Sequence, residues 1–167
     1  MHVPAFSSNK FSYQNLEPKI EILDSYLRWM QDVKNNSFIE SVNKDYSLEK
    51  LLHFIQDKNN SPEALLLGIF DKTNGIHFGN IKFEPIDLSS GTAWLGILIG
   101  DLRYRGKGYA TEVINSTCIH ISNIFGINKI YLGVNKSNSN ALKTYLKCNF
   151  MIYKESGSEG LVMIREV

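Results

Sequence analysis

A short basic stretch with two glycines is the part of the chain best suited to chemistry on an anion. Arg103, Arg105 and Lys107 supply three cations around Gly106 and Gly108. Glycine lets main-chain N–H groups approach a ligand closely and permits positive φ angles, and cationic side chains attract negative charge. These residue types at this spacing predict a phosphate site. The alternative interpretation is an ordinary connecting turn.

The residues on either side of this turn indicate how it is positioned. The run 94–99 is strongly apolar, as in a strand, and an amphipathic helix leaves the turn at once. Its apolar positions form one stripe: Ala110, Val113, Ile114, Thr117, Cys118, Ile121 and Phe125. A strand, a turn and a helix in this order direct free N–H groups and the positive end of a helix dipole at one point. We therefore interpret the turn as a pyrophosphate site.

Two familiar phosphate motifs do not fit this stretch. The Walker pattern G-x-x-x-x-G-K-[ST] does not occur. The dinucleotide pattern G-x-G-x-x-G/A fails because Thr111 occupies its last position, and no suitable acidic residue follows a second strand. A nucleotide-binding module unrelated to acyl transfer is therefore disfavoured, and a preference for ATP over acetyl-CoA would be its signature.

A second pattern follows on a helix predicted after the next strand. It reads N-x-x-A-x-x-x-Y-x-x-x-N-F, from Asn138 through Tyr145 to Phe150. The stretch from Arg103 to Glu112 resembles the acyl-CoA-binding motif of the GNAT superfamily of N-acetyltransferases, and the second pattern is similar to another motif of that family. Asn149 stands where a glycine is usual, and asparagine tolerates positive φ.

The resemblance covers about residues 64–155 well and the N-terminal part loosely. Trp29, followed by Asp32, is similar to the branch of ribosomal-protein N-terminal acetyltransferases. That branch also holds enzymes that act on amino sugars, polyamines and antibiotics. The resemblance implies a primary amine as acceptor, such as a protein N-terminus, an amino sugar or another small amine.

Acetyl-CoA is the acyl donor that the resemblance implies. It assigns the pyrophosphate to the glycine turn and the acetyl carbonyl to the main chain of the preceding strand. Asn138 would contact the pantetheine arm or cap its helix. The cofactor-binding candidates are Ile97, Leu98, Ile99, Arg103, Arg105, Gly106, Lys107, Gly108, Tyr109, Ala110, Thr111 and Asn138.

Tyr145 stands where the family places the acid that protonates the departing thiolate. A phenol with a pKa near ~10 stays protonated at neutral pH, and a thiol near ~8.5 is a fair leaving group. The alternative interpretation is a core aromatic residue on the stripe of its helix.

The sequence identifies the general base less clearly than any other part of the site. An ammonium group near ~10.4 must lose a proton before it attacks. Glu84 ends a predicted strand and is the catalytic candidate, and His77 and Asp101 lie near other strand ends. A water-relayed base, or an amine that arrives neutral, would need none of them. The missing base also leaves open a non-catalytic acetyl-CoA sensor of the same fold.

Composition describes an ordinary globular protein. The 167 residues are 43% hydrophobic and 21% charged, with a net charge of +1. No overall field therefore attracts nucleic acid. No run approaches the ~20 apolar residues of a membrane span, and the start does not resemble a signal peptide, so we expect a cytoplasmic protein. The two cysteines form no C-x-x-C pair, and the four histidines show no metal-ligand spacing, so we expect no metal.

The length suits one domain over residues 1–167, and the resemblance implies acceptor-side helices in 10–60 and an acetyl-CoA-binding core in 64–155. We expect an α/β (α+β) GNAT-like fold: a mixed, mostly antiparallel sheet of about six to seven strands flanked by about four helices. Strands are predicted in 10–16, 64–70, 76–83, 91–99, 129–134, 150–153 and 161–164, and 31–45 as a loop with a short helical turn. Positive and negative charges are balanced between residues 20 and 60, so the sequence does not indicate the chemical class of the acceptor. Both a monomer and a homodimer are compatible with the sequence.

Overall fold

The computed structural model describes residues 1–32 and 46–167. Within them one sheet has the spatial order β1-β2-β3-β4-β5-β6-β8-β7. The strands are β1 (Phe6–Ser7), β2 (Phe11–Asn15), β3 (Leu65–Asp71), β4 (His77–Asp87), β5 (Thr92–Ile99), β6 (Lys129–Asn135), β7 (Met151–Ser156) and β8 (Gly160–Glu166). The helices are α1 (Ile20–Gln31), α2 (Leu48–Asn60), α3 (Tyr109–Phe125) and α4 (Ser139–Lys147), with a 3-10 turn, η1 (Leu102–Tyr104).

The described part of the chain follows the predicted order of elements, with one strand more than the six to seven expected. The additional strand is β1, which consists of two residues and pairs with β2 through Phe6 and Ser7. So short a strand shows no alternation of apolar and polar residues, which is why the sequence predicts no strand before residue 10. Part of the predicted 31–45 loop, residues 33–45, lies outside the described residues.

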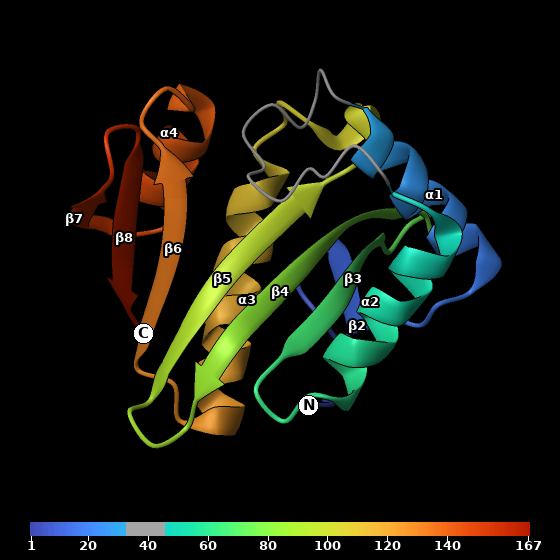
Figure 1. Ribbon diagram of the computed structural model, residues 1–167, viewed down its shortest axis with the longest axis horizontal. Coiled ribbons are helices and arrows are strands. Elements are labelled where there is room, and N and C mark those ends of the chain that lie inside the picture. The colour runs from blue at the N-terminus through green and yellow to red at the C-terminus, as the bar shows by residue number, and fades with distance from the viewer. Residues whose placement is uncertain (33–45) are drawn as a thin grey trace.

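Strand pairing is antiparallel throughout the described sheet except between β5 and β6. Those two strands are parallel because α3 connects them as a crossover, and Figure 1 shows α3 lying behind β4 and β5. The parallel pair therefore places the end of β5 and the start of α3 at one end of the sheet.

Helices cover both faces of the sheet, and each face has its own apolar core. On one face α3 and α4 pack against β3 to β6, around residues such as Ile81, Val113 and Leu132. On the other face α1 and α2 pack against Leu66 and Leu98. The sheet thus separates a helix pair that follows the glycine turn from the pair predicted to lie on the acceptor side.

Local sequence signals determine several of the helix ends. Ser47 caps α2 because its hydroxyl accepts a hydrogen bond from the N–H of Lys50 at 3.2 Å. Gly126 ends α3 with φ +68°. The polar run 57–62 predicts a turn, but α2 continues to Asn60, so the turn begins later. The apolar spacing of α4 predicts that Leu146 faces inward, but this residue is 55% exposed.

Candidate functional site

The two parallel strands separate after a short paired stretch. β5 and β6 pair only from Thr92–Trp94 to Lys129–Tyr131, although both strands continue well beyond. Figure 1 shows them diverging toward the end where α4 follows β6. The facing main-chain groups beyond Trp94 therefore lack the strand partner that a sheet normally supplies, and they form the walls of an opening.

A cleft of about 1010 Å³ occupies this opening. Its walls come from β5, the glycine turn, the start of α3, β6, α4 and the β7–β8 hairpin. Ten of the predicted site residues line it: Ile97, Leu98, Ile99, Arg105, Gly106, Gly108, Tyr109, Ala110, Asn138 and Tyr145. The fold thus brings most of the predicted positions into one cavity of the size that small-molecule ligands occupy.

The glycine turn closes one end of the cleft. Gly106 and Gly108 have φ angles of +71° and +75°, and Gly108 is the N-cap of α3. An L-residue with a side chain is strained at such angles, so the chain path itself requires glycine here. The N–H of Thr111 bonds the carbonyl of Gly108. The N–H groups of Tyr109 and Ala110 belong to the first turn of the helix and have no acceptor within it.

The three cations of the turn have different surroundings. Arg105 lines the cleft, and its Nε donates to the carbonyl oxygen of Ile99 at 2.6 Å. Arg103 turns away, forms an ion pair with Asp101 and lines a different cavity. Lys107 is exposed and lies outside the lining, and so does Thr111, whose carbonyl accepts from the thiol of Cys148. Arg105 is therefore the cation of the turn that faces the cleft directly.

Ile97 offers the main-chain groups that face the cleft from the middle of β5. The carbonyl of Leu98 is directed at β4, because a Cβ added to Gly79 would lie 2.4 Å from that oxygen. The carbonyl of Ile99 is directed away from β4, toward Arg105. Because main-chain groups alternate in direction along a strand, the N–H of Ile97 is directed toward the β6 side. The N–H of Ile99 shares this direction, but Arg105 already binds the carbonyl of Ile99 at the end of the strand, so Ile97 is the candidate that we assign to an oxyanion.

Tyr145 projects from α4 into the wall of the cleft and packs against the core. Burial raises the pKa of its hydroxyl to about 12. No hydrogen bond joins that hydroxyl to another residue in the described part of the chain. Tyr145 therefore holds its proton firmly and has an uncommitted donor beside the cavity.

Asn138 is positioned for both of the roles considered for it, which are to cap α4 and to contact the cofactor. Its Oδ1 accepts from the N–H of Ala141 at 3.2 Å and so caps α4, and the residue also lines the cleft. Sequence analysis missed Asn140, Lys143, Thr144 and Lys147, which line the same wall. Their spacing of three and four residues along the predicted helix was the available signal, since such positions share one helix face.

Glu84 lies outside the cleft lining, on the side of the sheet that α2 covers. Its carboxylate pairs with Lys58 at 2.8 Å and with Lys82 at 2.7 Å. Burial would raise the pKa of Glu84, but the hydrogen bonds from both lysines outweigh burial and lower it. A carboxylate held by two ammonium groups is a weak base, so this environment argues against Glu84 as the general base.

The other two base candidates line a separate cavity of about 470 Å³ between α1 and the end of β5. Hydrogen bonds from Arg103 lower the pKa of Asp101 below its ordinary value. Burial lowers the pKa of His77, so the imidazole is neutral near pH 7, and its Nε2 lies 2.8 Å from Oδ1 of Asn80. Neither side chain faces the larger cleft.

Two further observations concern metals and membranes. Among residues 1–32 and 46–167, no group of three or more His, Cys, Asp or Glu side chains could hold a metal ion. None of the helices described is long and apolar enough to cross a membrane. Cys118 and Cys148 are both buried free thiols, and Cys118 lies on the apolar stripe of α3.

Comparison with known proteins supplies the family. A family model described as an acetyltransferase (GNAT) domain matches residues 16–151. Among curated proteins, the spermine/spermidine N(1)-acetyltransferase of Bacillus subtilis strain 168 is 28% identical over 82 residues. That match spans 48% of this chain and 54% of the relative, so the chain spans about half the length of the curated relatives it matches.

Solved structures share the fold over almost the whole chain. The spermidine N-acetyltransferase of Vibrio cholerae, in complex with CoA and spermine, has a TM-score of 0.84 at 18% identity and covers 95% of this chain and 96% of its own. The ribosomal L7/L12 acetyltransferase RimL, in complex with CoA, has a TM-score of 0.83 at 12% identity, with 96% of each chain covered. At these identities the likeness establishes the fold.

Proposed function

The chain belongs to the GNAT acetyltransferase family, and from this premise we propose that it transfers the acetyl group of acetyl-CoA directly to the nitrogen of a primary amine. The observation that carries the proposal is the cleft between β5 and β6. It joins a glycine turn at a helix N-terminus, an unpaired strand edge and a protonated phenol. We propose as well that this amine is a protein N-terminus, an amino sugar or another small amine.

Acetyl-CoA fits the cleft in one direction. The pyrophosphate meets the N–H groups at the start of α3 and the guanidinium of Arg105. The pantetheine arm runs between the strands, where Asn138 and the free edge of β5 offer polar partners to its amides. The thioester then lies beside the N–H of Ile97 and faces the cleft wall to which Tyr145 belongs.

Transfer requires one bond to form and one to break. The amine nitrogen attacks the thioester carbon, and the carbonyl oxygen gains negative charge that the Ile97 N–H stabilises. The C–S bond breaks as the oxygen regains its double bond. The nitrogen loses one proton and the sulfur gains one, so the proton balance closes without an external acid.

Tyr145 stabilises the leaving sulfur by hydrogen bonding. Complete transfer from a phenol with a pKa of about 12 to a thiolate near ~8.5 is unfavourable on its own. The proton released by the attacking nitrogen offsets that cost when the tyrosine passes a proton on in the same step. Tyr145 therefore acts as a donor and relay.

The base that would deprotonate an incoming ammonium is not supplied by the cleft. Its lining, among the described residues, contains neither a carboxylate nor an imidazole. We propose that the amine reacts from its neutral form, with water as the first proton acceptor. The same observation favours the second candidate, a non-catalytic sensor that binds acetyl-CoA without transferring acetyl.

The test is thiol release from acetyl-CoA against a panel of amines: N-terminal peptides, polyamines, aminoglycosides and amino sugars, including nucleotide-linked ones. Release that depends on one amine class, with acetylated amine found by mass spectrometry, supports the proposal. Tight binding of acetyl-CoA with no release for any class would favour the sensor. Preference for ATP over acetyl-CoA in a titration would contradict both.

A further inference from the structure

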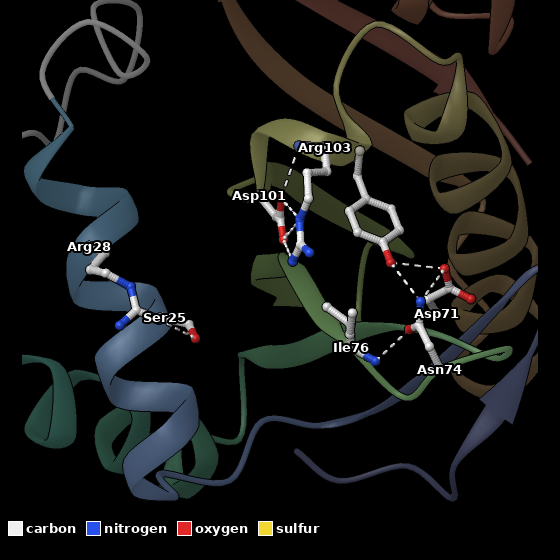
Figure 2. A network of polar contacts seen from close by, with 8 residues as sticks. Ser25, Arg28, Asp71, Asn74, Ile76, Asp101 and Arg103 are labelled. Carbon is white, nitrogen blue, oxygen red and sulfur yellow. Dashed lines mark hydrogen bonds and ion pairs between the residues drawn. The ribbon is translucent and has the colours of Figure 1, made fainter.

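The 470 Å³ cavity between α1 and η1 has no part in the proposed chemistry, yet charged residues line it. Its polar lining consists of Ser25, Arg28, Asp32, His77, Asp101 and Arg103, and Figure 2 shows Arg28 on α1 lying across from Asp101 and Arg103. Trp29, Ile76, Gly100 and Leu102 complete it. Its volume lies within the range of small-ligand sites.

Arg28 brings a positive charge that has no acidic partner among the described residues. Its Nη2 donates to Oγ of Ser25 at 3.2 Å, which is its hydrogen bond in this part of the chain. The other N–H groups of the guanidinium stay available, because an arginine carries five donors. The residue is exposed, so a ligand in the cavity can reach it.

Arg103 faces the same cavity in a fixed orientation. Its Nε lies 3.0 and 3.1 Å from the two carboxylate oxygens of Asp101, and its Nη2 lies 2.6 Å from Oδ2. This fork-like contact leaves the N–H groups of Nη1 for a ligand. Asp101 is neutralised in the process, so its charge does not repel an anion strongly.

The remaining wall suits a flat, apolar group. The ring of Trp29 lies against the main chain of Gly100, where an added Cβ would come within 1.9 Å of ring atom Cδ2. The ring of His77 lies 4.9 Å from that of Trp29. Asp32 is the other carboxylate in the lining, and its charge acts on Arg105 in the wall of the larger cleft.

We propose that this cavity binds an anionic group of the acceptor, a carboxylate or a phosphate, through Arg28 and Arg103. The proposal rests on the acetyltransferase function proposed above and names its substrate class. Gly100 lines this cavity and Ile99 lines the larger cleft, so the two sites meet at the end of β5. An acceptor with an amine at one end and an anion at the other spans them. Within the described lining Arg28 is the charge without an ion-pair partner, since Asp101 is paired with Arg103 and the charge of Asp32 acts on Arg105.

The kinetic test compares amines that differ in the anion alone: tyramine, its phosphate monoester and 4-(2-aminoethyl)benzoate, with spermidine as the polycation. We expect kcat/KM to be higher for the phosphate or the carboxylate than for tyramine. Arg28→Gln should remove that advantage, a loss of roughly 10- to 100-fold for one charge-assisted hydrogen bond, and leave tyramine unchanged. Lys19→Gln, on an exposed residue just before α1, is the matched control and should change neither.

A binding test separates failure of this inference from failure of the proposed function. In a Trp94→Phe protein the fluorescence of Trp29 reports the cavity, since the chain has two tryptophans. With CoA saturating, phenyl phosphate should change that signal, and Arg28→Gln should weaken the response by a similar factor.

Three results would overturn the inference. If all three aryl amines are acetylated equally and phenyl phosphate does not change the fluorescence of Trp29, the anion site is contradicted but the acetyltransferase function is not. Spermidine as the best substrate would contradict it directly. A Trp29 response in a protein that acetylates no amine would overturn the proposed function, and the acceptor role of the cavity with it.

Discussion

Tyr145 shows how position and environment together define a catalytic proposal at the scale of one residue. The second motif singled out this tyrosine, and burial raises the pKa of its hydroxyl to about 12. What the sequence could not provide is that environment, because it depends on core residues that pack against α4 from elsewhere in the chain. Because the pKa is so high, we expect the hydroxyl to act as a hydrogen-bond donor and relay.

Replacing Tyr145 by phenylalanine removes the hydroxyl and keeps the ring in the core. We expect kcat to fall by about 10²-fold or more, the usual scale of proton-transfer assistance, and the affinity for acetyl-CoA to stay within a few-fold. Steady-state kinetics and acetyl-CoA titration measure the two effects. Tyr153→Phe, on exposed β7, is the control. Wild-type turnover in Tyr145→Phe would take the hydroxyl out of the mechanism.

The dependence of rate on pH tests the missing base. If the amine reacts from its neutral form, kcat/KM should rise about tenfold per pH unit up to the pKa of the amine itself, near ~10.4 for a lysine-like amine. Tyr145 stays protonated throughout, since its pKa is about 12, so no descending limb is expected below that range. A plateau beginning near pH 6 or 7 would place a general base on the protein.

Glu84 forms a contact that the sequence around it does not reveal. Its place at the end of a strand made it the base candidate, but its partner Lys58 comes from α2, 26 residues earlier in the chain. Spacing along the sequence contains no sign of that contact. We therefore expect the ion pairs of Glu84 to stabilise the sheet and α2.

Glu84→Gln should therefore lower the free energy of unfolding by on the order of 1 kcal/mol and leave kcat within about twofold. The folded-state pKa of Glu84 is lowered, so its stabilising effect is present at neutral pH and lost as pH falls through that pKa. Denaturant unfolding at pH 7 and at acidic pH should show the difference between the proteins shrinking in acid. A large loss of kcat with unchanged stability would restore Glu84 as the base.

At the scale of elements, α3 has a glycine with positive φ at each end, and only one of them faces the cleft. Gly108 is its N-cap and lines the cleft, whereas Gly126 is its C-cap, remote from the lining. A Cβ at either position meets no atom within 4 Å. The two glycines are therefore a matched pair for separating backbone strain from ligand contact.

Gly108→Ala and Gly126→Ala should each destabilise the fold by about 1 to 2 kcal/mol, the cost of a left-handed conformation for an L-residue. Only Gly108→Ala should also weaken acetyl-CoA binding, because its methyl group would stand between the phosphate and the N–H groups of the helix. Thermal unfolding and calorimetric titration of both variants provide the comparison. Equal affinities of the two variants for acetyl-CoA would contradict a pyrophosphate site at Gly108.

Elements were predictable where the pattern was local and long. The stripe of α3, the cap of α2 and the run of β5 all follow from spacing within the segment. The separation of β5 from β6 does not, since pairing stops at Trp94 and Tyr131, in two segments whose paired residues are 37 positions apart. The resemblance to the family indicated only that the acetyl carbonyl lies against the main chain of this strand.

At the scale of the whole molecule, the fold places two cavities around the end of one strand. The larger lies between the diverging strands and holds most of the predicted cofactor residues, and the smaller lies on the α1 side. The central claim is that acetyl-CoA occupies the larger one. Oligomeric state, for which monomer and homodimer were both expected, stays a prediction.

The most direct test of that claim fills the cleft. Gly133 on β6 lines it, and an added Cβ there meets nothing within 4 Å, so Gly133→Trp can enter the opening without disturbing the core. Lys129→Trp adds the same ring at the closed end of the same strand. We predict that wild type and Lys129→Trp bind one equivalent of acetyl-CoA by calorimetry and that folded Gly133→Trp does not. Unchanged binding by Gly133→Trp would mean that acetyl-CoA lies elsewhere.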